Sequence, residues 1–179
     1  MSTVHLELES RPESVAMVRA MLAGASELLE LGAELLADLK TAISEACNNV
    51  VMHAYGEDLG PLIVDFVAGP AGIEVTVRDR GAGIRDATPA ENHMGVGIAV
   101  INTLAARADF LSSPAQGTEV RMLFAYRGSD IHEVAATVLE GPVAPPAFID
   151  GQVVLSVAPV PLLSGILGRI AGAVAAQAY

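Results

Sequence analysis

The sequence predicts an α/β (α+β) two-layer sandwich, in which a mixed, mostly antiparallel sheet carries helices on one face. Two observations lead to this prediction. The expected elements up to residue 125 follow the order β-α-α-β-β-α-β-β. Hydrophobic residues make up 52% of the 179 residues, but only 4% are aromatic, so the chain can build one domain around an aliphatic core.

The first three elements follow from the spacing of apolar residues. Alternation over residues 4–9 predicts a half-buried strand. Apolar residues at helical spacing predict a helix through residues 12–31, which Gly32 ends, and a second helix through residues 33–54. The buried face of the second helix is expected to contain Leu39, Ala42, Ile43, Ala46 and Val50.

The remaining elements of this domain are bounded by glycine and proline. In order they are strands at residues 62–68 and 73–78, a loop at residues 79–94, a helix at residues 96–108, and strands at residues 110–112 and 118–125.

Three segments are expected along the chain: a domain at residues 1–127, a helix and proline-rich linker at residues 128–150, and a strand-helix segment at residues 151–179. The last segment resembles the start of a second, truncated copy of the first domain, because Val153, Leu155, Val157 and Pro161 match Val4, Leu6, Leu8 and Pro12 at a constant offset of 149 residues. A strand-helix pair that matches by chance remains an alternative.

The charge of the chain excludes some classes of partner. A formal net charge of −11 argues against nucleic acid, whose phosphates need a basic surface. An acidic surface is compatible with simple solubility or with a basic protein partner. The single cysteine, Cys47, excludes an internal disulfide, and the sequence shows no signal peptide or membrane span, so we expect a cytoplasmic location.

Three motifs contain residues suited to chemistry. On the second helix, Glu45, Asn49 and His53 recur at every fourth position and form a polar stripe that drifts towards the buried face at His53. A carboxylate and a carboxamide at the edge of a buried face can serve a hard cation or a proton transfer. The same pattern also occurs in an ordinary amphipathic helix.

The second motif follows the strand at residues 73–78. Asp79 is followed by Gly81 and Gly83, so a carboxylate is available to an exocyclic amine while the glycines allow backbone to approach a flat ring. An ordinary turn can have the same composition.

The third motif, His93-Met94-Gly95-Val96-Gly97-Ile98, is a glycine-rich turn at the start of a helix, where free N–H groups suit phosphate. It lacks the third glycine of a dinucleotide fingerprint, and no P-loop motif occurs. Thr118, at the start of the last strand, could offer its hydroxyl to a ligand.

The order and spacing of these motifs resemble those of the Bergerat-fold (GHKL) ATPases, which include gyrase and the histidine kinases. Within that superfamily, SEACNNVVMHAYG at residues 44–56 resembles the anti-sigma-factor serine/threonine kinases. The resemblance covers roughly residues 4–125. It implies a Bergerat ATP-binding fold.

Carried over onto this sequence, the resemblance implies ATP and Mg²⁺ as cofactors. It implies that Glu45 is the catalytic residue, which positions or deprotonates the attacking serine hydroxyl, and that Asn49 ligates Mg²⁺. Asp79 would bind the adenine amino group, while His53 and Tyr55 would support the site structurally. The other residues implied to contact the nucleotide are Gly81, Gly83, His93, Gly95, Val96, Gly97, Ile98 and Thr118.

The resemblance also implies partners: a sigma factor that the chain binds, a STAS-type antagonist whose serine it phosphorylates, and a second copy in a homodimer. One position departs from the family, where an Arg or Lys often precedes the G-x-G; here His93-Met94 stands there. This leaves a non-catalytic module that senses ATP or ADP as the alternative. A catalytic fragment of a sensor histidine kinase is less favoured, because no phospho-accepting helical hairpin fits upstream of residue 4.

Overall fold

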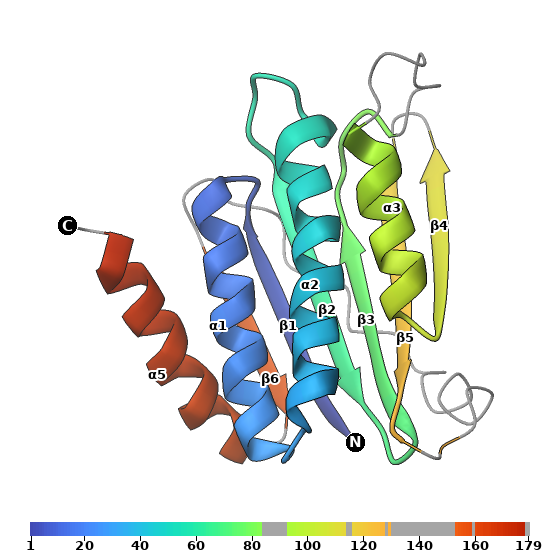
Figure 1. The fold of residues 1–179 in the computed structure, drawn as a ribbon. Helices are drawn as coiled ribbons and strands as arrows, with labels where there is room; N and C mark the ends of the chain where they lie inside the picture. The colour runs from blue at the N-terminus through green and yellow to red at the C-terminus, as the bar shows by residue number, and fades with distance from the viewer. Residues whose placement is uncertain (84–92, 114–115, 128, 130–152, 159, 178–179) are drawn as a thin grey trace.

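The described strands of the protein form one six-stranded antiparallel sheet in a computed structural model, which describes residues 1–83, 93–113, 116–127, 129, 153–158 and 160–177. The strand order is β4-β5-β3-β2-β1-β6. The helices α5, α1, α2 and α3 lie in a row over one face of this sheet (Figure 1). The predicted two-layer α+β fold is therefore confirmed, with every described strand pair antiparallel.

The elements in chain order are β1 (Ser2–Glu9), α1 (Pro12–Leu28), α2 (Ala33–Asn49), the π-helix η1 (Val50–Ala54), β2 (Pro61–Ala68), β3 (Gly72–Arg78), α3 (His93–Leu104), β4 (Arg107–Ser113), β5 (Gly117–Ala125), β6 (Val154–Ala158) and α5 (Val160–Gln177).

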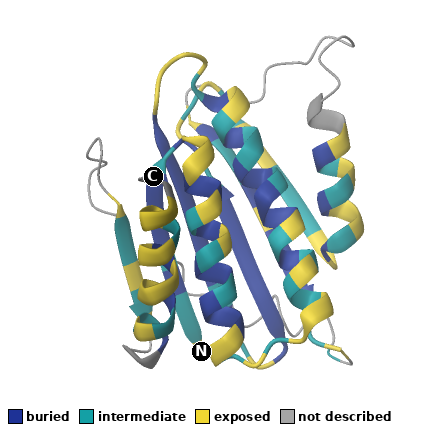
Figure 2. Ribbon diagram, turned by 60° about the vertical axis from the view of Figure 1, so that its left-hand side comes forward, coloured by how far each residue is buried: buried dark blue, intermediate teal, exposed yellow. Residues whose placement is uncertain are grey.

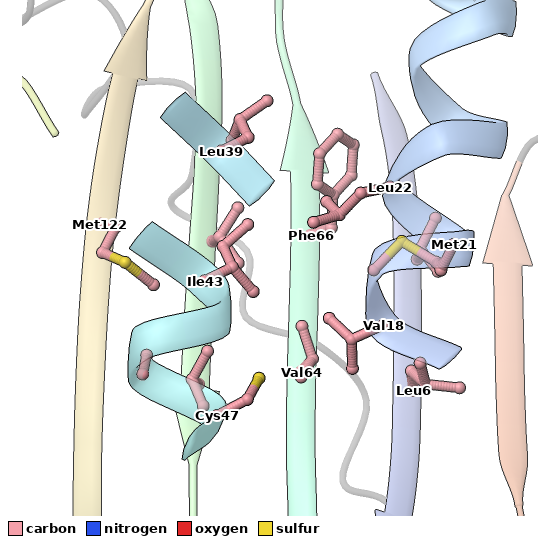
Figure 3. Packing of buried hydrophobic residues seen from close by; sticks show 14 of the residues in the cluster. Leu6, Val18, Met21, Leu22, Leu39, Ile43, Cys47, Val64, Phe66 and Met122 are labelled. Atoms are coloured by element: carbon pink, nitrogen blue, oxygen red, sulfur yellow. The ribbon is translucent and has the colours of Figure 1, made fainter. Parts of the chain in front are cut away.

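The main core lies between the sheet and the helices α1 and α2. Every apolar residue expected on the buried face of the second helix is at most 5% exposed. These side chains meet apolar residues of α1 and of the central strands, and burial of this aliphatic surface is the main force that holds the two layers together. Figure 3 labels Leu6, Val18, Met21, Leu22, Leu39, Ile43, Cys47, Val64, Phe66 and Met122 of this cluster.

The other face of the central strands β2 and β3 is also buried, and on β1 the predicted half-buried pattern fails at Glu7, whereas His5 and Glu9 stay partly exposed. Glu7 of β1 is only 1% exposed, and both of its carboxylate oxygens are buried without a hydrogen-bond partner among the described residues. On the same face, Nδ1 of His5 lies 2.7 Å from Oδ1 of Asp65, and Arg78 donates to the other oxygen of Asp65. Pairing between polar side chains of adjacent strands is what allows most of them to be covered here.

Four helix boundaries differ from the predictions. The first helix ends at Leu28 instead of residue 31. The helix expected at residues 33–54 divides into α2 and η1, since its last turn is a π-helix. The helix expected at residues 96–108 begins at His93 and ends at Leu104, because the chain enters β4 at Arg107. The strand expected at residues 110–112 is therefore longer than predicted.

The C-terminal strand and helix expected from the sequence repeat are present as β6 and α5. β6 pairs with β1 at the edge of the sheet, and α5 lies beside α1 with most of its surface exposed (Figure 2). Apart from Ser129, the helix and linker expected at residues 128–150 lie outside the described residues. None of the described helices is long and apolar enough to cross a membrane.

Candidate functional site

The polar residues of α2 form the centre of the site. Glu45 and Asn49 stand one turn apart on the same helix and are both partly exposed, whereas their neighbours Ala46 and Cys47 are buried at 1% and 0%. The buried side of α2 fixes the helix against the sheet. The two polar side chains are therefore held at the border between core and solvent.

Gly97 of α3 lies directly against both of these side chains. A Cβ at Gly97 would stand 3.1 Å from Oε2 of Glu45, and 3.6 and 3.7 Å from Nδ2 and Oδ1 of Asn49. Any larger residue would press on the carboxylate. A glycine at this position therefore lets the N-terminal half of α3 approach Glu45 and Asn49 closely.

Asp79 is held at the end of β3 by backbone amides. Its Oδ1 accepts N–H bonds from Gly81 at 2.8 Å and from Thr118 at 3.1 Å, and Asp79 itself is only 6% exposed. Its own N–H donates to the carbonyl of Thr118 at 3.0 Å. A buried carboxylate held by two amides is a fixed acceptor, because rotation would break both bonds.

Gly117 makes this arrangement possible. It has a φ of +86°, and a Cβ there would lie 2.2 Å from the carbonyl oxygen of Asp79. Both the backbone conformation and the missing side chain are thus required. Gly81 is confined in the same manner, since a Cβ would lie 2.1 Å from the carbonyl oxygen of Ala54 at the end of η1.

The helix pair α2–η1 connects the two halves of the site. Gly97 contacts it at Glu45 and Asn49, and Gly81 contacts it at Ala54, where the N–H of Ala82 also donates to the Ala54 carbonyl at 3.1 Å. The carboxamide on α2 and the carboxylate loop after β3 are therefore attached to one continuous helix.

Tyr55 supports the loop after β3 through its hydroxyl. The O–H donates to the carbonyl of Pro61 at 2.7 Å and accepts the N–H of Arg80 at 2.7 Å. Burial raises the pKa of Tyr55 to about 12, so the hydroxyl keeps the proton that it donates. Its ring also packs on Gly60, where a Cβ would lie 2.3 Å from a ring carbon.

His53 does not join the polar stripe, contrary to the prediction. It is exposed, as is Met52, and only Ala54 and Val50 of η1 are buried. A π-helix turns through a smaller angle per residue than an α-helix. The residues after Asn49 are therefore rotated away from the positions that an α-helix would give them. His53 therefore points to solvent.

The remaining predicted site residues lie on β5, in the loop after β3 and in the first turns of α3. Thr118 contributes its backbone to Asp79, while its hydroxyl lies 3.5 Å from that of Ser112. Val96 is 67% exposed. Gly83 has a φ of +74° beside β4. His93, Gly95 and Ile98 lie in the first turns of α3, and Ile98 is partly buried.

Two supporting groups were not predicted: the backbone of Gly117 and the ring contact between Tyr55 and Gly60. Both depend on residues that meet only after folding. The Gly-Thr pair before the last strand was the one local signal for Gly117.

Residues 8–124 match the model of the histidine kinase-like ATPase domain. This match spans more than half of the chain and contains all the residues just described. The chain belongs to this ATPase family. Its membership implies that the family's nucleotide, ATP, is used here, and every site residue from Glu45 to Thr118 lies inside the matched region.

Several similar curated proteins are named as serine-protein kinases. The chain is 31% identical over 115 residues to the serine-protein kinase RsbW of Bacillus mycoides (strain KBAB4) and to that of Bacillus thuringiensis (strain Al Hakam), covering 56% of this chain and 72% of each relative. Among solved structures, it is similar to the RsbU and RsbW domains of Rv1364c from Mycobacterium tuberculosis, with a TM-score of 0.56 and 25% identity. That match covers 69% of this chain and 32% of the other. The predicted enzyme class, a serine/threonine protein kinase, is confirmed at the level of the family.

Proposed function

We propose that the protein is an ATP-dependent serine kinase that phosphorylates an anti-sigma antagonist and binds a sigma factor. The observation that carries the proposal is the contact of Gly97 with both Glu45 and Asn49. This contact supports the proposal because it brings the N-terminal half of α3, whose start would bind phosphates, close to one carboxylate and one carboxamide. Phosphoryl transfer depends mainly on such positioning and on neutralisation of charge.

The residues around Asp79 fit an adenine ring. Two backbone amides fix the carboxylate through Oδ1, which leaves Oδ2 to accept a hydrogen bond from the exocyclic amine. Gly81 and Gly83 let the loop after β3 pack against Ala54 and Ser113, where a Cβ at either position would clash. Thr118 serves this half of the site through its backbone, which holds Asp79 in place.

Asn49 is proposed as the one protein ligand of Mg²⁺. The described residues contain no group of three or more His, Cys, Asp or Glu side chains that could hold a metal. This agrees with Mg²⁺, which retains several waters and is bound through few protein oxygens together with phosphates. Bound there, the ion would neutralise phosphate charge.

Glu45 is proposed to position the serine hydroxyl of the protein substrate and to accept its proton. Its Oε2 lies on the side of α2 that Gly97 faces, so the carboxylate borders the start of α3. It is partly exposed, which leaves it accessible to an incoming side chain. A general base must be within hydrogen-bond reach of the proton that it removes.

The two protein partners come from the family. The relatives are named serine-protein kinases, and a STAS-type antagonist and a sigma factor are the substrate and the target that we infer for this chain. The net charge of −11 suits a basic partner surface and opposes direct binding to nucleic acid.

Transfer of labelled phosphate from ATP to a serine of a STAS-type antagonist tests the kinase proposal. Glu45→Gln keeps the size of the side chain and removes the base, so transfer should fall by about 100-fold or more. The control is Glu34→Gln, an exposed glutamate of the same helix. Wild-type protein that binds ATP but labels no antagonist would instead support the non-catalytic sensing module.

The Mg²⁺ proposal has its own control in the neighbouring residue. Asn49→Ala should abolish the part of the ATP-induced rise in melting temperature that requires Mg²⁺. Asn48→Ala removes the same side chain one position along the helix, where it points in another direction. Equal losses in the two variants would reject a ligand role for Asn49.

A further inference from the structure

The unit formed by β6 and α5 repeats the unit formed by β1 and α1 in structure as well as in sequence. In both units a short strand leads directly into a helix, and the offset of 149 residues places Leu155 on Leu6 and Pro161 on Pro12. The two units lie side by side at one end of the sheet (Figure 1).

The strand register has two-fold symmetry. Leu6 pairs with Leu155, and Leu155 is also the residue that corresponds to Leu6 at the offset of 149 residues. His5 pairs with Ser156, the counterpart of Glu7, and Glu7 pairs with Val154, the counterpart of His5. In a symmetric pair of identical surfaces, residue i contacts j while j contacts i. The β1–β6 pair obeys this rule around an axis through Leu6 and Leu155.

The helices meet around the same axis. A Cβ at Gly24 would lie 3.0 Å from both the carbonyl oxygen of Gly165 and the Cα of Ile166, so the backbones of α1 and α5 touch. The counterpart of Gly165 is Ala16. A Cβ at position 165 would meet only the flexible end of Leu28, at 2.8 Å, and Gly24 backbone at 3.8 Å. An alanine is therefore tolerated there at small cost.

Two features make α5 a better fit than α1 of another copy. Leu162 is 4% exposed, and its counterpart is the charged Glu13. Arg169 forms an ion pair with Glu27 of α1, whereas its counterpart is Ala20. The β6–α5 unit is also part of the same chain, which raises its effective concentration. It therefore outcompetes a second copy for this surface.

We propose that β1–α1 is a self-complementary dimerisation surface that β6–α5 occupies within the same chain. The β6–α5 unit takes the position that β1–α1 of a second copy would occupy. It thereby prevents the intact chain from dimerising through this surface. Displacement of β6–α5 exposes it to a second copy, which then pairs β1 with β1 around Leu6. The homodimer expected from the family resemblance cannot use this surface while β6–α5 is in place. The proposal does not depend on the kinase function.

Light scattering on the full chain tests the proposal. Ile166 is 0% exposed and Leu167 is 47% exposed, so Ile166→Asp should release the unit while Leu167→Asp should not. We expect a monomer for wild type and Leu167→Asp, and a dimer for Ile166→Asp. An added peptide of residues 153–177 should return that dimer to monomers. A dimeric wild type, or a folded Ile166→Asp that stays monomeric, overturns the proposal.

A cross-link identifies the interface. The contact of Gly24 with Gly165 and its counterpart Ala16 places Ala20 opposite Ala20 of the second copy. Ala20→Cys in the Ile166→Asp chain should therefore form an intermolecular disulfide. Cys47 is buried and its pKa is raised to about 12, so it stays unreactive. If circular dichroism shows Ile166→Asp unfolded, Gly165→Leu replaces it with the same expectations, and a dimer without the cross-link counts against the proposal.

Discussion

Asp79 and Thr118 lie 39 residues apart in the chain and are joined by two hydrogen bonds, one in each direction. The N–H of Thr118 donates to Oδ1 of Asp79 at 3.1 Å, and the N–H of Asp79 donates to the carbonyl of Thr118 at 3.0 Å. The first bond aligns the carboxylate, and the second aligns the strand ends. With the proposed adenine role, ligand binding and stability are expected to be coupled at Asp79.

Asp79→Asn should separate these two roles. The amide oxygen can still accept the N–H groups of Gly81 and Thr118, so the melting temperature should change little. The amide NH₂ then faces the adenine amine, and loss of a charge-assisted bond of about 1.5–3 kcal/mol weakens ATP binding roughly 10- to 100-fold. Calorimetric titration measures the affinity. Asp58→Asn, in an exposed turn, is the control, and unchanged affinity in Asp79→Asn would remove the adenine role.

Gly97→Ala should stabilise the fold and damage the activity. Alanine improves helix propensity by about 1 kcal/mol, so the melting temperature should hold or rise. The new Cβ stands 3.1 Å from Oε2 of Glu45 and displaces the carboxylate, so phosphate transfer should fall. Gly172→Ala, in open space on α5, is matched for propensity and should leave transfer intact. Equal transfer in both variants would contradict the close packing at Gly97.

The sequence predicted those parts of the site that depend on short spacing. Glu45 and Asn49 share a helix face because residues four apart always do, and the glycines near Asp79 and Gly97 are visible as local patterns. The predicted position of His53 was wrong because the formation of a π-helix depends on packing beyond the helix itself. The pairing of Asp79 with Thr118 could not be predicted, because it joins residues that only the folded sheet brings together.

The fold, like the site, could be predicted only where local sequence patterns determine it. Alternation predicted β1 as a strand, but not that its polar face would be covered, since Glu7 has no local feature that marks it as buried. The sequence repeat predicted β6 and α5 as elements. Their symmetric position across β1 depends on register, which is set by which apolar residues meet at the shared edge.

Glu74→Gln should stabilise the protein at neutral pH. Burial is the main cause that raises the pKa of Glu74 above 4.5, with Arg121 opposing it. The folded state therefore holds the proton more tightly than the unfolded state, so the stability contributed is present below about pH 4.5 and is lost as pH rises through the folded pKa. Glutamine stays neutral throughout.

Urea unfolding at about pH 4 and pH 7 checks this expectation. The stability gain of Glu74→Gln should appear at the higher pH and vanish at the lower. Glu119→Gln is the control, because Glu119 also contacts Arg121 at 2.9 Å but is more exposed. A Glu74→Gln variant less stable than wild type at pH 7 would mean that the ion pair with Arg121 outweighs the cost of burial.

Tyr55→Phe removes a hydroxyl that makes two hydrogen bonds of 2.7 Å, to Pro61 and from Arg80. Leaving these partly buried backbone groups unpaired should cost about 1–3 kcal/mol. Because Arg80 follows Asp79, ATP affinity should fall as well. Tyr126→Phe is the control, since the Tyr126 hydroxyl makes no hydrogen bond to other described residues.

The pH dependence of unfolding gives Tyr55 a second signature. Its pKa is raised from 10.0 to about 12, chiefly by burial, so its contribution is complete below pH 10 and is lost as pH rises towards 12. Wild type should therefore lose stability over this range more steeply than Tyr55→Phe, which has no proton to release. Equal slopes for the two proteins would show that the hydroxyl ionises as freely in the fold as in the unfolded chain, and burial would not then raise its pKa.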